Sequence, residues 1–120
     1  MTDDIFAARV AKVRQRFIAT LAAKIDQTSA ALPQVSGEGP PAAAAVADAF
    51  RCMHGIVGIG RTVGFAAIGD AAHKIVEVLR PPFNAGRGLT TDETSNLKNL
   101  LQALRTVAAP ELQTSDSLQQ

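Results

Sequence analysis

Hydrophobic residues recur at intervals of three and four positions in four segments of the chain, the spacing of helices with one buried face. These segments span residues 3–31, 42–62, 65–79 and 90–110. The stripe of the first segment consists of Phe6, Val10, Val13, Phe17, Leu21 and Ile25. No run alternates apolar and polar residues for long enough to build a sheet. The pattern therefore predicts an all-α fold, an antiparallel four-helix bundle with short connections.

Proline and glycine mark the predicted ends of these helices. Residues 33–41 contain three prolines and two glycines, a density that predicts a loop. Gly64 separates the second helix from the third, and the prolines of residues 80–82 are predicted to end the third. The fourth helix is expected to begin with Thr90 or Thr91 as its cap and to stop at Pro110.

The length of 120 residues suits a single domain. We predict one helical bundle over residues 1–110 and a polar tail over residues 111–120. The residues expected in the core are Ile56, Ile59, Val63, Ile68, Ile75, Leu100 and Leu104.

The second helix carries a histidine on the side opposite its apolar stripe, when residues are placed about 100° apart. That stripe consists of Ala45, Ala49, Cys52, Ile56, Ile59 and Val63. His54 is therefore predicted to be exposed at mid-helix, and Gly58 lies one turn further along the same face. A glycine inside a helix costs roughly 1 kcal/mol relative to alanine. Open space beside the imidazole would compensate for that cost.

Four other side chains are predicted to share the face of His54. Arg51 and Arg61 place positive charge there, which suits an anionic group. Phe50 and Val57 place apolar surface around the histidine, as a patch for docking a partner requires.

The segment His54-Gly-Ile-Val-Gly58-Ile-Gly60-Arg-Thr-Val-Gly64 resembles the signature of histidine-containing phosphotransfer (HPt) domains, His-x-Leu-Lys-Gly-x-Ala/Ser-x-x-x-Gly. The resemblance implies a bundle in a bacterial-type phosphorelay, with His54 as phosphoacceptor and Gly58 leaving room for the phosphoryl group. The sequence departs from the signature at Val57, where the family usually has lysine or arginine. The candidates for the replacing cation, in order of expectation, are Arg51, Arg61 and Lys74.

The resemblance also implies the partners: the receiver domain of a response regulator and a sensor (hybrid) histidine kinase. Mg²⁺ is expected in the partner receiver domain, and no cofactor is expected in this chain. There is no kinase motif, so the chain is expected to carry phosphate without being an enzyme of its own. The alternative is a helical binding module that docks a receiver or kinase and regulates it without being phosphorylated.

Composition and motifs argue against binding of nucleic acid, membranes, dinucleotides and metal ions. The net charge of +1 gives no reason to expect nucleic acid or a membrane surface as partner. The N-terminus has no signal-peptide pattern, so a cytoplasmic location is expected. The chain is also expected to be a monomer. The glycines of residues 58–64 follow no strand, which argues against a dinucleotide loop. His54 and His73 lack an acidic or cysteine cluster at ligand spacing, so no metal site is expected.

Overall fold

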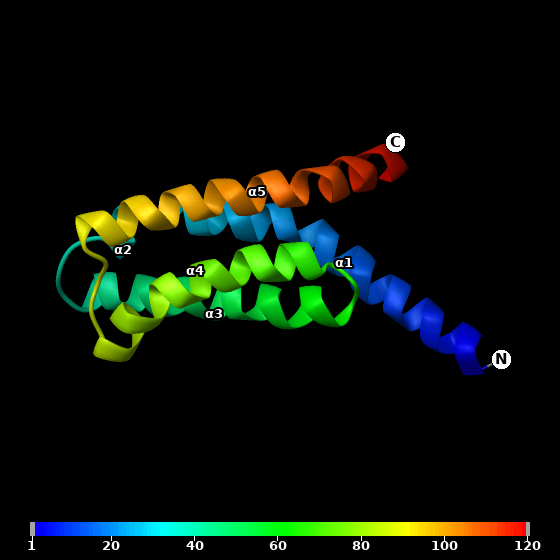
Figure 1. Ribbon diagram of the computed structural model, residues 1–120, viewed down its shortest axis with the longest axis horizontal. Coiled ribbons are helices and arrows are strands. Elements are labelled where there is room, and N and C mark those ends of the chain that lie inside the picture. The colour runs from blue at the N-terminus through cyan, green and yellow to red at the C-terminus, as the bar shows by residue number, and fades with distance from the viewer. Residues whose placement is uncertain (1, 120) are drawn as a thin grey trace.

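The computed structural model describes residues 2–119 and the side chains of residues 4–112, and four long helices and one short helix make up its fold (Figure 1). The helices are α1 (Thr2–Ala30), α2 (Leu32–Val35), α3 (Pro40–Thr62), α4 (Ala66–Ala85) and α5 (Thr91–Gln119). Figure 1 shows α3 and α4 as a hairpin, with α5 and the second half of α1 packed along one side. The all-α four-helix bundle is confirmed.

Neighbouring long helices run antiparallel. Gly64, at φ +96°, makes the tight turn between α3 and α4, and the amide of Phe65 donates to the carbonyl of Gly60 at 2.7 Å. A left-handed conformation of this kind suits glycine because it has no Cβ. On the other side of the bundle, Arg105 of α5 reaches across to Asp26 of α1 at 2.7 Å.

The core is made by apolar residues from all five helices. Ile56, Val63, Ile68, Ile75 and Leu104 are buried, as predicted. Two of the predictions are wrong: Ile59 is 39% exposed and Leu100 is only half-buried. The buried stripe of α3 consists of Ala42, Val46, Ala49, Met53, Ile56 and Gly60. It is rotated from the predicted stripe because α3 carries apolar residues on most of its circumference.

Two facing glycines bring α3 and α4 close together beside the turn. A Cβ built on Gly60 would lie 3.4 Å from the backbone of both Gly69 and Phe65. A Cβ on Gly69 would lie 2.7 Å from Cγ of Arg61, which is closer than packed atoms approach. These small residues therefore fix the separation of the two helices, and that separation sets how their side chains meet.

The first half of α1 extends beyond the end of the α3–α4 hairpin (Figure 1). The predicted stripe of α1 is buried at Phe17, Leu21 and Ile25, but Phe6 is 68% exposed and Val13 is 42% exposed. The prediction of one continuous core stripe is therefore wrong for the N-terminal half of α1. The pattern is helical throughout, but no element of the described chain covers that half.

Prolines interrupt the helices less than predicted. Pro33 lies in the first turn of α2, where a missing amide donor is tolerated, so residues 33–35 are helical and not part of a loop. Pro81 and Pro82 lie inside α4, which continues to Ala85 and is capped by Gly86 in the left-handed conformation. Pro110 likewise lies inside α5, which ends at Gln119. Gln120 and the tail side chains beyond Leu112 lie outside the described residues.

The predicted cap of the last helix is present as a reciprocal pair of hydrogen bonds. The amide of Glu93 donates to Oγ1 of Thr90 at 3.1 Å, and the amide of Thr90 donates to Oε1 of Glu93 at 2.9 Å. This arrangement satisfies two amides that the first turn leaves without helical partners. Arg87 binds the same carboxylate at 2.7 Å, and its hydrogen bond is the main cause that lowers the pKa of Glu93 to about 2.

We expect the Glu93 cap to make stability fall in acid. Because folding lowers the pKa of Glu93 from 4.5 to about 2, its contribution is complete above about pH 4.5 and is lost as the pH falls toward 2. Glu93→Gln should remove this contribution, on the order of 1 kcal/mol because water screens the ion pair. Urea unfolding at several pH values measures it. Equal losses of stability between pH 5 and pH 3 in both proteins would contradict the assignment.

By length and composition alone, α3 could cross a membrane. In this fold its apolar side packs against the other helices of the bundle, and α3 and α4 share the most extensive helix contact. Six residues of α3 are buried in the core, and they account for part of its apolar composition.

Candidate functional site

His54 lies at the middle of α3 with its side chain exposed, as predicted from its helical position. A Cβ added at Gly55 or at Gly58 would meet no atom within 4 Å, so the surface beside the imidazole is open. Met53, the preceding residue, is fully buried and anchors this part of the helix in the core. The backbone under the histidine is thus held in place while its ring remains accessible.

Aromatic rings from α3 and α4 stack beside the histidine. The ring of Phe50 lies 6.0 Å from the imidazole of His54, centroid to centroid, with 21° between their planes. Phe83 of α4 stacks on Phe50 at 4.3 Å and 10°. The guanidinium carbon of Arg80 lies 5.6 Å from the centroid of Phe50, a distance at which a cation is attracted to the ring. Phe50 therefore contacts both the histidine and an arginine of the neighbouring helix.

Two of the three predicted cations around His54, Arg61 and Arg51, are paired with carboxylates. Arg61 donates two hydrogen bonds to Oδ1 of Asp70 on α4, at 3.1 and 2.9 Å. Arg51 lies 3.5 Å from Asp48 on its own helix, and the side chain of Arg51 is 69% exposed. The sequence alone did not reveal the partner of Arg61, because that pair depends on how α3 and α4 are aligned.

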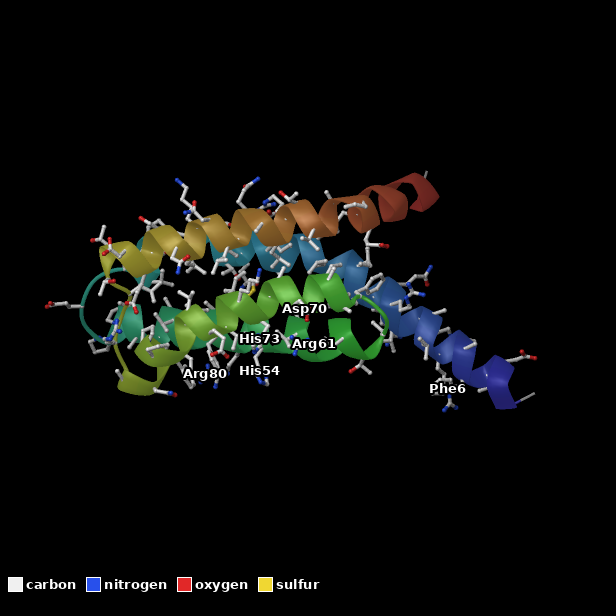
Figure 2. The ribbon with its side chains drawn as sticks, viewed as in Figure 1. Phe6, His54, Arg61, Asp70, His73 and Arg80 are labelled. Atoms are coloured by element: carbon white, nitrogen blue, oxygen red, sulfur yellow. The ribbon has the colours of Figure 1, made fainter. Side chains whose placement is uncertain are left out.

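The side chains of α3 and α4 form two facing rows along the hairpin. One row consists of Phe50, His54, Val57 and Arg61 on α3, and the other of Asp70, His73, Glu77 and Arg80 on α4. The rows are joined at one end by the Arg61–Asp70 ion pair and at the other by the Phe50–Arg80 contact. Figure 2 shows His54, His73 and Arg80 gathered on one face of the hairpin, with Arg61 and Asp70 nearer its turn.

The contacts at the two ends of these rows show which residues of α4 lie at the same height as His54. His54 is four residues, or about 6 Å, along α3 from Phe50, and Glu77 is three residues, or about 4.5 Å, along α4 from Arg80. The Arg61–Asp70 ion pair, seven residues from both His54 and Glu77, and the Phe50–Arg80 contact together place His54 and Glu77 at about the same height. By the same reasoning, His73 lies level with Val57.

Glu77 contacts two other members of its row, His73 and Arg80. Its Oε1 lies 3.1 Å from Nη2 of Arg80 and 3.4 Å from Nε2 of His73. All three side chains are between 44% and 50% exposed, so they are accessible from the same face as His54. The sequence analysis missed Glu77 and Arg80 as site residues. Their spacing with His73, at i, i+4 and i+7, was the available signal that one face of α4 concentrates charge.

The described residues hold no group of three or more histidine, cysteine, aspartate or glutamate side chains able to bind a metal ion. His73 and Glu77 are close enough to share an ion, but the other side chain that contacts Glu77 is the cation of Arg80, which cannot bind a metal. The chemistry offered by this surface is that of an accessible imidazole nucleophile between aromatic, acidic and basic side chains.

Comparison with protein families matches residues 12–107 to the Hpt domain. The match covers most of the chain, including all of α2, α3 and α4 and the half of α1 that packs in the bundle. Comparisons with curated proteins and with solved structures find no match. The chain belongs to the Hpt domain family, all-helical phosphorelay domains that carry a phosphoryl group on histidine and are not kinases.

Proposed function

We propose that this protein accepts a phosphoryl group on His54 from the aspartyl phosphate of one receiver domain and passes it to a second receiver. The donor would be the receiver of a hybrid sensor histidine kinase, and the acceptor that of a response regulator. The observation that carries the proposal is the exposed imidazole of His54 with open space at Gly55 and Gly58.

The proposed transfer forms one bond and breaks another. The lone pair of the unprotonated ring nitrogen of His54 attacks phosphorus in line with the aspartyl oxygen. As the nitrogen–phosphorus bond forms, the phosphorus–oxygen bond breaks, and the carboxylate leaves with the electron pair. The proton on the other ring nitrogen stays on the imidazole or passes to water. A Mg²⁺ ion held by the receiver would neutralise charge on the phosphoryl oxygens.

The surface around His54 supports docking of a receiver. Phe50 and Val57 are half-buried and flank the histidine on α3, so part of each side chain is available to a partner. A transient complex of this kind needs an interface on the order of 1,000 Å². We propose that the chain works as a monomer in the cytoplasm, where it meets its receivers by diffusion.

Val57 favours one other function. A valine in place of the usual cation suits a module that binds a receiver or kinase and regulates it without taking phosphate. Such a module would bind the same partners at the same surface, so binding alone does not separate the two functions.

A transfer assay separates them. A receiver domain from the same organism is charged with acetyl phosphate and Mg²⁺, freed of the donor and mixed with this protein. The phosphocarrier function predicts that phosphate leaves the receiver and appears on this chain in an acid-labile form. Binding to the receivers of the organism without uptake of phosphate from any of them would instead support the regulatory module.

A further inference from the structure

The position three residues after His54, where the family usually has lysine or arginine, carries no positive charge in this chain. Position 57 is valine, so α3 supplies no lysine or arginine three residues after His54. A phosphohistidine carries charge on strongly accepting oxygens, which charge-assisted hydrogen bonds stabilise. Some other group of the protein or of its partner must therefore provide the donor.

The two cations on the His54 side of α3 are both paired with carboxylates. Arg61 is held by two hydrogen bonds to Asp70 and lies seven residues, or about 10 Å of rise, from His54. Arg51 is turned about 100° around the helix from Phe50, one of the residues of α3 that contact α4. Arg51 therefore lies on the side of His54 away from Phe50, and it pairs with Asp48 at 3.5 Å.

Arg80 of α4 has a better position. Its guanidinium lies over the ring of Phe50, which stacks against the imidazole of His54. The side chain is 46% exposed, so it has room to reorient toward the histidine. In the unmodified protein Arg80 binds Glu77, the carboxylate that lies level with His54. A phosphoryl group on His54 would place new negative charge beside that carboxylate, and the two anions would compete for the same guanidinium.

On these grounds we propose that Arg80 is the cation that supports the phosphoryl group on His54, in place of a lysine at position 57. Glu77 holds Arg80 while His54 is unmodified and so limits how strongly the phosphoryl group is retained. This inference depends on the proposed phosphocarrier function, and it assigns to α4 the positive charge that is missing at position 57.

The test measures how phosphate divides at equilibrium between a receiver domain charged with acetyl phosphate and this protein. Arg80→Ala should shift the division about fivefold toward the receiver, the effect of losing one partly exposed charge pair. Arg80→Lys should restore part of the shift, because the charge is kept but the two-pronged geometry is lost. Val57→Lys added to Arg80→Ala should also restore it. Arg9→Ala, in the half of α1 that extends beyond the hairpin, is the matched control, expected to leave the division unchanged. A larger shift in Arg51→Ala than in Arg80→Ala would overturn the assignment of Arg80.

Glu77→Gln, measured in the same assay, tests the role of Glu77. It should shift phosphate about twofold toward this protein when Arg80 is present, and less than that in the Arg80→Ala background. An equal shift in both backgrounds would show that Glu77 acts by simple repulsion, which would overturn its role as the holder of Arg80.

Other outcomes separate the failure of this inference from the failure of the proposed function. If the wild-type protein accepts phosphate and Arg80→Ala changes nothing, the assignment of Arg80 is wrong while the phosphocarrier function stands. If the wild-type protein accepts no phosphate from any receiver of the organism, both are wrong. Melting temperatures of all variants should lie close together, because the substituted side chains are at least partly exposed.

Discussion

Replacing His54 with glutamine is expected to reduce phosphate uptake to background while leaving the fold intact. Glutamine is polar and similar in length, but it has no ring nitrogen able to attack phosphorus. The side chain is exposed, so the free energy of unfolding should change by less than about 0.5 kcal/mol. Transfer from a phosphorylated receiver and thermal unfolding, measured on the same preparation, check both parts.

His73→Gln is the matched control for this substitution. His73 is the second histidine of the chain and lies on the same face of the hairpin, with its side chain 44% exposed (Figure 2). It should accept no phosphate, so its replacement should leave uptake largely unchanged. Loss of uptake in His73→Gln, with uptake retained in His54→Gln, would move the phosphoacceptor to α4.

Gly58→Leu is expected to slow transfer on the order of 100-fold, because displacement of reacting groups by about 1 Å costs that much. Gly58 lies one turn beyond His54, and the space beside it is empty. A leucine there would occupy the region in which the phosphoryl group must approach the imidazole. Leucine is also the better helix former by up to about 1 kcal/mol, so the variant should be at least as stable as the wild type.

Gly55→Leu separates the steric effect from helix propensity. Gly55 is equally open, but adjacent residues on a helix do not face each other. This variant should gain similar stability and keep transfer within a few-fold of the wild-type rate. Normal transfer in Gly58→Leu would show that the empty space beside His54 has no part in the reaction.

The exposure of His54 and the space at Gly58 could be predicted from sequence because both depend on one helix alone. The angle between residues of an α-helix is fixed, so His54 stays on the side away from Ile56 and Ala49, which are buried in both the predicted and the observed stripe. The exact core stripe of α3 could not be predicted in this way. Apolar residues such as alanine, valine, isoleucine and methionine occupy most of the circumference of α3. The close contact between Gly60 of α3 and Gly69 of α4 determines which side of α3 is buried.

The side chains of α4 on the His54 face of the hairpin could not be predicted, because their place depends on the alignment of two helices. The Arg61–Asp70 pair and the contact of Arg80 with Phe50 follow from the separation and register that Gly64 and the facing glycines impose. The helix ends were also misjudged at Pro82 and Pro110. A proline removes one amide donor, but packing on the core and a glycine cap can carry the helix past it.

The position of the phosphoryl group tests the central claim most directly. The protein is phosphorylated by a charged receiver, digested under alkaline conditions that preserve phosphohistidine, and mapped by mass spectrometry with fragmentation that keeps the nitrogen–phosphorus bond. The account predicts a single modified residue, His54, and no modification in His54→Gln. Phosphate located on any other residue, or its absence after exposure to every receiver domain of the organism, would contradict the account.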